Sequence, residues 1–164
     1  MPRYLLFDLD GTLLPMDTDA FMKLYFGGLA AYAAPDGYDP RALIDGIMEG
    51  TRAMVQNDGT RTNAEAFWDV FASKFGEAAR RSEARFEGFY REKFDAAAVA
   101  CPKNPEVRGV IDRLKNEGYR LILATNPLFP AIATEHRLAW AGLSPDDFEL
   151  VTTYDNSHYA KPNP

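Results

Sequence analysis

The hydrophobic pattern begins with a short apolar run that predicts a β-strand. The run Tyr4 to Phe7 carries apolar side chains without alternation, and the turn-forming run Asp10 to Thr12 follows it. An unbroken apolar run bounded by a turn is typical of a central strand of a parallel sheet, buried on both faces. We therefore expect the first strand at residues 4–7.

Two later segments each predict a helix that leads into a strand. In the first, Asn104 is a candidate N-cap and Gly118 a stop signal, and an apolar strand is expected at residues 119–124. The apolar positions at helical spacing are Val107, Val110, Ile111 and Leu114. In the second, residues 132–141 predict a helix that ends before Gly142, and residues 148–153 predict a strand. This alternation indicates an α/β fold with a Rossmann-like parallel sheet of about three strands.

The segment between these two parts of the sheet has a helical pattern throughout. We expect helices from Asp17 or Asp19 to Ala33, at 40–55, after a capping box formed by Thr62 and Glu65, and at 77–94. The third of these helices has an aromatic face, for which bundle core is a stronger interpretation than a ligand cage: Phe67, Trp68, Phe71 and Phe75. Such a segment is too long for a loop. The predicted organisation is a sheet core at 1–15 and 101–164, with a helical cap at 16–100.

Composition and charge narrow the class of protein. The chain has 164 residues, 46% of them hydrophobic and 26% charged, which is typical of a folded globular domain. Its formal net charge of −6 repels phosphate backbones, so we expect no nucleic-acid partner. The single cysteine, Cys101, excludes an internal disulfide framework and fits a small core residue in a reducing compartment.

No segment predicts a membrane anchor. No apolar run approaches the roughly 18 residues that a spanning helix needs. The apolar start is interrupted by Asp8 and Asp10, too early for a signal peptide. We therefore expect a soluble, cytoplasmic protein without a membrane partner.

Polar side chains follow each predicted strand. Asp8 and Asp10 come after the first strand, Thr125 and Asn126 after the second, and Lys161 after the third. Ligands of open α/β sheets bind beyond the carboxyl ends of the strands, so these groups are expected to converge. Taken alone, the aspartates fit an ordinary turn, Thr125 a turn hydroxyl and Lys161 a surface charge. Their occurrence together and in this order indicates a site.

These motifs resemble the haloacid dehalogenase superfamily, specifically its phosphatase branch. The family's first motif, an aspartate pair followed by Gly-Thr, matches residues 8–12, and its second, a hydrophobic strand that ends in Ser or Thr, matches residues 121–125. The third, a lysine commonly followed by proline, matches Lys161-Pro162. The family also inserts an all-helical cap where residues 16–100 lie.

The resemblance implies a Mg²⁺-dependent phosphohydrolase that acts on a small phosphorylated metabolite. Asp8 would be the nucleophile that forms an aspartyl-phosphate, and Asp10 the general acid and base. Asp8 and the main-chain carbonyl of Asp10 would bind Mg²⁺. Thr125 and Asn126 would bind the phosphate, and Lys161 would supply positive charge to the phosphate and to Asp8.

The family's fourth motif, which supplies further acidic metal ligands on a later strand, has no match before Pro164. We therefore expect this sequence to be the N-terminal portion of a longer phosphatase, with the first strand at an edge of the sheet and with weak Mg²⁺ binding. The sequence leaves open a phosphomutase of the same superfamily and a catalytically impaired phosphate-binding fragment. It indicates neither the substrate nor the oligomeric state.

Overall fold

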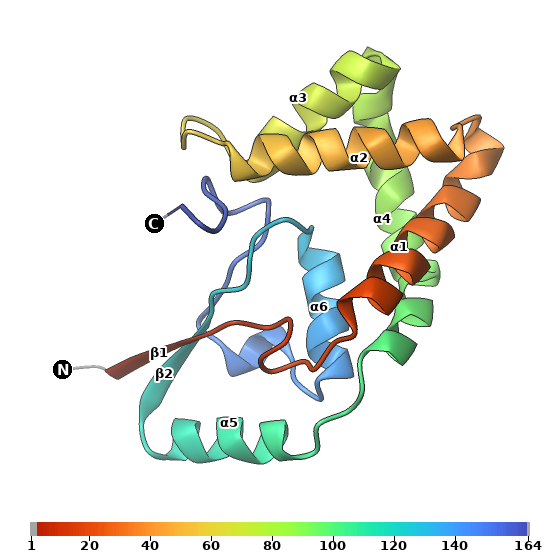
Figure 1. Cartoon of the computed structure of the whole chain (residues 1–164). Helices are drawn as coiled ribbons and strands as arrows, with labels where there is room; N and C mark the ends of the chain where they lie inside the picture. The colour runs from red at the N-terminus through yellow and green to blue at the C-terminus, as the bar shows by residue number, and fades with distance from the viewer. Residues whose placement is uncertain (1–2, 164) are drawn as a thin grey trace.

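Three short strands form a parallel sheet in the order β1-β2-β3 (Figure 1). The computed structural model describes residues 3–163 and places β1 at Arg3–Phe7, β2 at Tyr119–Leu123 and β3 at Leu150–Val151. In the register of the sheet, Phe7 lies opposite Leu123, which lies opposite Val151. The expected α/β fold with a Rossmann-like parallel sheet is confirmed.

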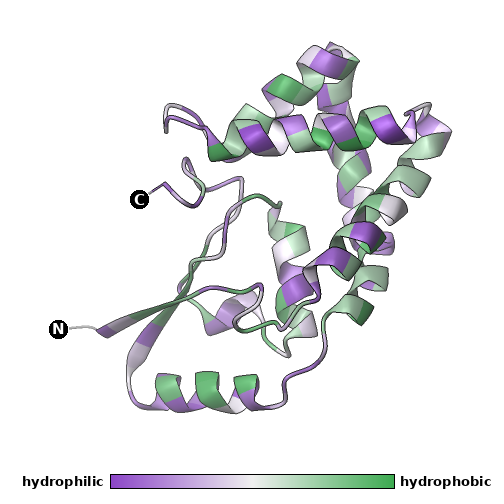
Figure 2. Cartoon of the chain, viewed as in Figure 1, coloured by the Kyte–Doolittle hydropathy of each residue, from purple (hydrophilic) through white to green (hydrophobic). Residues whose placement is uncertain are grey.

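The two helices that directly precede β2 and β3 cover the same face of the sheet. The crossovers through α5 (Glu106–Asn116) and α6 (Ala131–Trp140) step in the same direction along the sheet. Because parallel crossovers are right-handed, both helices lie on one side. Apolar residues recur along α5 at helical intervals (Figure 2). Leu121 and Leu123 of β2 are buried.

The other face of the sheet is open, which corrects the prediction of a first strand buried on both faces. The side chains of Tyr4 and Leu6 in β1 are 44% and 65% exposed, and Leu150 in β3 is 48% exposed. Leu6, Ile122 and Leu150 lie opposite one another and form one row on this face. A continuous apolar run predicts burial on both faces, but α5 and α6 cover one face, and the burial of β1 alternates from Tyr4 to Phe7.

The strand β3 is shorter than the predicted 148–153. Its ladder joins only Leu150 and Val151 to β2. Single backbone hydrogen bonds continue on both sides, from the Glu149 N–H to the Leu121 carbonyl (2.8 Å) and from the Thr152 N–H to the Leu123 carbonyl (3.0 Å). The chain then leaves the sheet in a turn, in which the side chain of Asn156 accepts from the Thr153 N–H (2.8 Å).

Four α-helices fill the segment between β1 and α5. They are α1 (Thr18–Ala33), α2 (Pro40–Val55), α3 (Asn63–Phe75) and α4 (Glu83–Glu92), and they are joined by the 3₁₀ segments η1 (Ala34–Asp36), η2 (Glu77–Ser82) and η3 (Phe94–Ala100). The predicted single helix at 77–94 is therefore wrong in part. Within η2 only Ala79 is buried, so this stretch has no apolar face for an α-helix to bury. The predicted division into core and cap remains a prediction.

Caps define where these helices begin. The side chain of Asp17 accepts from the Ala20 N–H (3.0 Å) at the start of α1. At α3 both halves of the capping box are present, since Thr62 Oγ1 accepts from the Glu65 N–H and the Glu65 carboxylate accepts from the Thr62 N–H. The starts predicted for α1 and α3 are confirmed. In α5 the helix begins at Glu106, and Asn104 Oδ1 accepts from its N–H (3.1 Å).

Aromatic side chains form the centre of the helical segment. Phe71, Phe89 and Phe94 are each 1% exposed, and they belong to one hydrophobic cluster that also includes Leu121 and Leu123 of the sheet.

Over residues 3–163, no helix is both long enough and apolar enough to cross a bilayer.

Candidate active site

The turn after β1 holds Asp8 and Asp10 at the carboxyl end of the sheet. Gly11 has a φ of 78°, a conformation that side chains disfavour, and so a glycine is required there. The N–H of Leu14 donates to the Leu9 carbonyl (2.9 Å), and both leucines are fully buried. The buried leucines fix a tight turn, which presents the two aspartates.

Lys161 reaches the nucleophile candidate Asp8. Its Nζ lies 2.8 Å from Asp8 Oδ1, and the two side chains are 51% and 39% exposed. The backbone of Lys161 is held by Asn126, whose Oδ1 accepts from the Lys161 N–H (3.0 Å). The structure thus brings together Asp8, Asn126 and Lys161 from three separate segments.

Thr125 follows β2 at the carboxyl end of the sheet, and its hydroxyl is buried. The Ala124 N–H donates to the Phe7 carbonyl (2.8 Å), which continues the register of β1 and β2 and places Asp8 opposite Ala124, the residue before Thr125. Thr125 is 2% exposed, and its Oγ1 has no hydrogen-bond partner among the described residues. Buried hydroxyls are normally paired, so this one is available to an oxygen atom of a ligand.

Asp10 is paired with a buried arginine. Arg137 Nη1 donates to Asp10 Oδ2 (2.5 Å), while Asp10 Oδ1 is buried and has no partner within residues 3–163. Arg137 is 1% exposed, and its other donors reach the Ala133 carbonyl (3.3 Å) and Thr134 Oγ1 (3.2 Å). Its guanidinium lies over the ring of Phe129, 4.4 Å from the centroid. Asp10 is therefore held in one orientation.

The sequence prediction missed Arg137. A signal for it exists, because Arg137 stands four residues after Ala133 and four before Ala141, on the buried face of α6. A charged residue on the apolar face of a helix is almost never buried without a partner. That partner is Asp10, which is distant in the sequence.

Cys101 is a core thiol, as expected from the sequence. It is 5% exposed and unpaired with another cysteine. Burial, followed by the nearby negative charge of Asp10, raises the pKa of Cys101 to about 11. The thiolate form is therefore scarce at neutral pH, and Cys101 is not an activated nucleophile.

A turn from the helical segment lies against the site loops. Asn63 is fully buried, and its Nδ2 donates to the carbonyls of Pro127 (3.2 Å) and Tyr159 (3.1 Å). Its Oδ1 accepts from Asn57 Nδ2 (2.9 Å). The turn between α2 and α3 therefore lies beside the C-terminal residues in Figure 1. Because α2 and α3 are joined here to the segments that carry Asn126 and Lys161, the helical segment covers one side of the site.

The oxygen atoms of Asp8 and Asp10 fit a magnesium ion in part. Mg²⁺ prefers oxygen ligands and is commonly held by one or two carboxylates, with water and substrate phosphate filling the other positions. Asp8 offers one carboxylate oxygen beyond the one that contacts Lys161, and the carbonyl of Asp10 lies in the same turn. Within residues 3–163, no cluster of three or more acidic, histidine or cysteine side chains is arranged to hold a metal. The donors fit a Mg²⁺ that keeps most of its water.

Comparison with known proteins supports one family. A model of the haloacid dehalogenase-like hydrolases matches residues 2–164. A solved structure of a HAD family enzyme from Bacteroides thetaiotaomicron is similar at 19% identity and a TM-score of 0.45, with 99% of this chain and 73% of that chain covered. The search of curated proteins gave no match. Because the family model spans nearly the whole chain, the protein belongs to the haloacid dehalogenase-like hydrolases.

Proposed function

We propose that this hydrolase is a Mg²⁺-dependent phosphatase of small phosphate monoesters. One observation carries the proposal: the Asp8–Lys161 pair, with Nζ and Oδ1 2.8 Å apart, lies at the same edge of the sheet as Thr125, whose buried hydroxyl has no partner among the described residues. A nucleophilic carboxylate, a cation and a free donor are the groups that in-line attack on a phosphoryl group requires.

Asp8 and Asp10 would divide the chemistry between them. A carboxylate oxygen of Asp8 attacks phosphorus, and the bond from phosphorus to the leaving oxygen breaks. Asp10, when it carries a proton on Oδ1, the oxygen that Arg137 does not contact, gives that proton to the leaving oxygen, which departs as an alcohol. Asp10 then takes a proton from water, the water oxygen attacks the aspartyl-phosphate, and Asp8 is released as a carboxylate with inorganic phosphate as product.

The remaining groups would orient and neutralise the phosphate. Thr125 donates its free hydroxyl to a phosphoryl oxygen, Lys161 balances negative charge, and Asn126 holds Lys161 in place. When bound to Asp8 and the Asp10 carbonyl, Mg²⁺ would supply positive charge against the phosphoryl oxygens.

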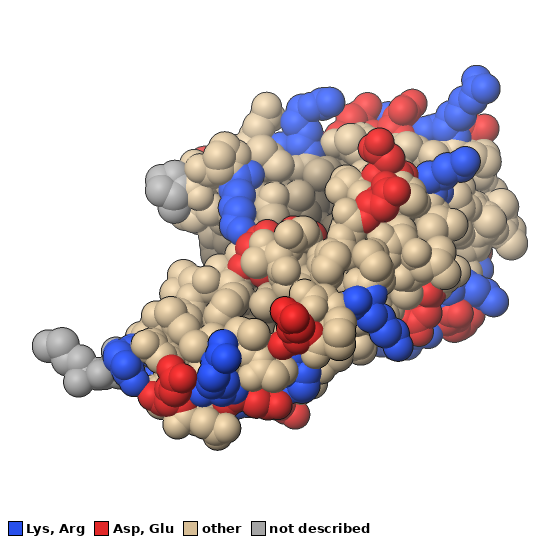
Figure 3. Space-filling model, turned by 60° about the horizontal axis from the view of Figure 1, so that its bottom comes forward, with Lys and Arg blue, Asp and Glu red and all other residues tan. Residues whose placement is uncertain are grey.

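The substrate is proposed to be a small metabolite. The face in Figure 3 carries acidic and basic side chains interspersed, without a basic stripe of the kind that nucleic acids bind. The net charge of −6 also disfavours a polyanionic partner. We place the reaction in the cytoplasm, since the single cysteine is free.

Phosphate release from 4-nitrophenyl phosphate, measured with Mg²⁺ and with EDTA, tests this proposal. We expect release that requires Mg²⁺ and is lost in Asp8→Asn. Asp19→Asn is the matched control, because Asp19 is an exposed carboxylate in the first turn of α1. Release that Asp8→Asn leaves intact would overturn the proposal, and so would binding of phosphate without turnover. Sugar phosphates that isomerise without phosphate release would instead indicate a phosphomutase.

A further inference from the structure

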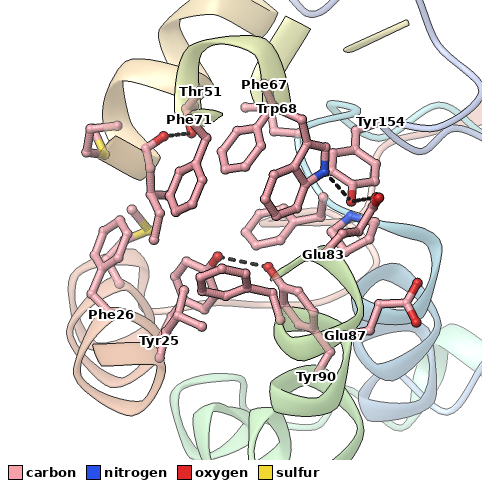
Figure 4. Close-up of a pocket in the computed structure, with 18 residues that line it drawn as sticks. Tyr25, Phe26, Thr51, Phe67, Trp68, Phe71, Glu83, Glu87, Tyr90 and Tyr154 are labelled. Carbon is pink, nitrogen blue, oxygen red and sulfur yellow. Dashed lines mark hydrogen bonds between the residues drawn. The ribbon is translucent and has the colours of Figure 1, made fainter. Parts of the chain in front are cut away.

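An apolar cavity of about 220 Å³ lies inside the helical segment (Figure 4). Its walls come from α1, α2, α3 and α4, and residues 128–130 together with Tyr154 complete the lining. Nearly all of the atoms that face it are apolar. The cavity is distinct from the candidate active site, since Asp8, Asp10, Thr125 and Lys161 are not among its lining residues.

Two of the polar groups in the wall bond to each other. The hydroxyls of Tyr25 and Tyr90 lie 2.9 Å apart and are buried. Burial raises the pKa of Tyr25 to about 12 and also raises the pKa of Tyr90, so both are uncharged at neutral pH. Thr51 Oγ1 donates to the Ile47 carbonyl in its own helix (2.8 Å).

The polar groups at the other side of the cavity are also satisfied. Trp68 Nε1 donates to the Tyr154 hydroxyl (3.5 Å), which donates to Glu83 (3.2 Å). Glu87 is paired with Arg91 (2.8 Å). Water inside would find few free partners, although a buried water needs two to four. The wall instead matches a largely apolar ligand that makes few hydrogen bonds.

We propose that this cavity binds an uncharged aromatic or compact aliphatic group. An engineered apolar cavity of about 150 Å³ holds benzene, so this larger one can take a bicyclic ring such as indole. Anions are excluded, because Glu83 and Glu87 are the charged residues of the lining and no basic side chain is among the described residues that form it.

The aromatic face of α3 belongs both to the hydrophobic core and to the wall of the cavity. The sequence favoured bundle core for it, and Phe71 and Trp68 are indeed buried, at 1% and 7% exposure. Together with Phe67 they also line the cavity. Part of the aromatic core therefore packs around open space instead of around other side chains.

The ring of Phe129 lines the cavity and also contacts Arg137, which pairs with Asp10 of the candidate active site. One side of this ring is covered by the Arg137 guanidinium, which pairs with Asp10, and Tyr25 of the cavity packs against it with centroids 5.5 Å apart. The apolar group could thus come from two sources. It is either the leaving group of a phosphorylated substrate, a case that rests on the proposed function, or a separate small molecule.

Isothermal titration calorimetry with indole tests the site without any need for catalysis. We expect indole to bind the wild-type protein and Asp8→Asn equally. Thr51→Phe places a ring in the cavity and should weaken binding at least about tenfold, a difference of about 1.4 kcal/mol. Thr51→Val is the matched control, since it keeps the shape and removes only a hydroxyl that already bonds within α2. Leu128→Trp fills the space from another wall if Thr51→Phe does not fold.

Absence of indole binding to the wild-type protein would overturn the inference. Equal binding by Thr51→Phe and Thr51→Val would do so as well, because the site would lie elsewhere. If the protein binds indole but shows no phosphatase activity, the cavity is a binding site and only the proposed function is overturned. Kinetics with 1-naphthyl phosphate and glycerol phosphate separate the two sources. A KM raised by Thr51→Phe for the naphthyl ester alone identifies a leaving-group site, whereas indole that binds without changing either KM identifies a separate molecule.

Discussion

Replacement of Arg137 by methionine should destabilise the fold through Asp10. The change removes the donor to Asp10 Oδ2 and the hydrogen bonds to the Ala133 carbonyl and Thr134 Oγ1. Methionine keeps an unbranched apolar chain against the Phe129 ring, so little packing is lost. The Asp10 carboxylate is left with no partner on either oxygen, since Oδ1 has none among the described residues.

The expected loss can be estimated from the burial of the pair. Removal of one partner from a buried ion pair typically costs about 3–5 kcal/mol. The Arg137 side chain is 1% exposed but that of Asp10 is 34% exposed, so water can solvate the remaining carboxylate in part. We therefore expect a loss near the lower end, about 3 kcal/mol in the free energy of unfolding at pH 7. This corresponds to a fall in Tm of about 6–12 °C.

Urea denaturation followed by far-ultraviolet circular dichroism measures this loss. The matched control is Arg120→Met, because Arg120 pairs with Glu149 at the surface, where the side chains are 48% and 40% exposed. Surface pairs contribute about 0–1 kcal/mol. A loss in Arg137→Met no larger than that in Arg120→Met would contradict the stabilising role of the Arg137–Asp10 pair. So would a double-mutant cycle with Asp10→Asn that gives no coupling energy.

Three further predictions concern stability and reactivity. Asp147→Asn should lower the free energy of unfolding by about 2 kcal/mol at pH 7, since the carboxylate of Asp147 accepts from Arg108 and Lys115. Hydrogen bonds from Arg108 hold the pKa of Asp147 well below its usual range. The contribution of this carboxylate to the free energy of unfolding is therefore present above about pH 4 and declines as the pH falls further. In urea denaturation, the difference in the free energy of unfolding between Asp147→Asn and the wild type should be smaller at pH 3 than at pH 7. Asn63→Ala should cost about 3 kcal/mol by the same assay, because the carbonyls of Pro127 and Tyr159 lose their donor, and a loss under about 1 kcal/mol would contradict the role given to this turn. Cys101 should not react with a thiol reagent at pH 7 until the protein is unfolded, and rapid labelling of the native protein would contradict its burial.

Local signals in the sequence were sufficient to predict most of the helices. Asp17 and the Thr62–Glu65 capping box are groups whose effect depends only on residues within one turn, and the structure has helices α1 and α3 where they predict them. The stretch Glu77–Ser82 carries no such cap, and its α-helical prediction failed because η2 buries only one residue.

Long-range contacts were less predictable. The order of motifs along parallel strands was enough to anticipate that Asp8, Asn126 and Lys161 come together. The Arg137–Asp10 pair depends on how α6 packs against the turn after β1, and no pattern within either segment specifies this. The exposure of Leu6 depends on which face of the sheet the helices cover, and the cavity depends on how four helices fit together.

Identification of the covalent intermediate tests whether Asp8 is the nucleophile. The protein is quenched during turnover of a phosphate monoester, treated with borohydride, which reduces an acyl phosphate to an alcohol, and analysed by peptide mass spectrometry. We expect homoserine at position 8 in the wild-type protein and no reduced residue at that position in Asp8→Asn. Continued phosphate release with an unreduced Asp8, or reduction at Asp10 in its place, would contradict the assignment of Asp8 as the nucleophile.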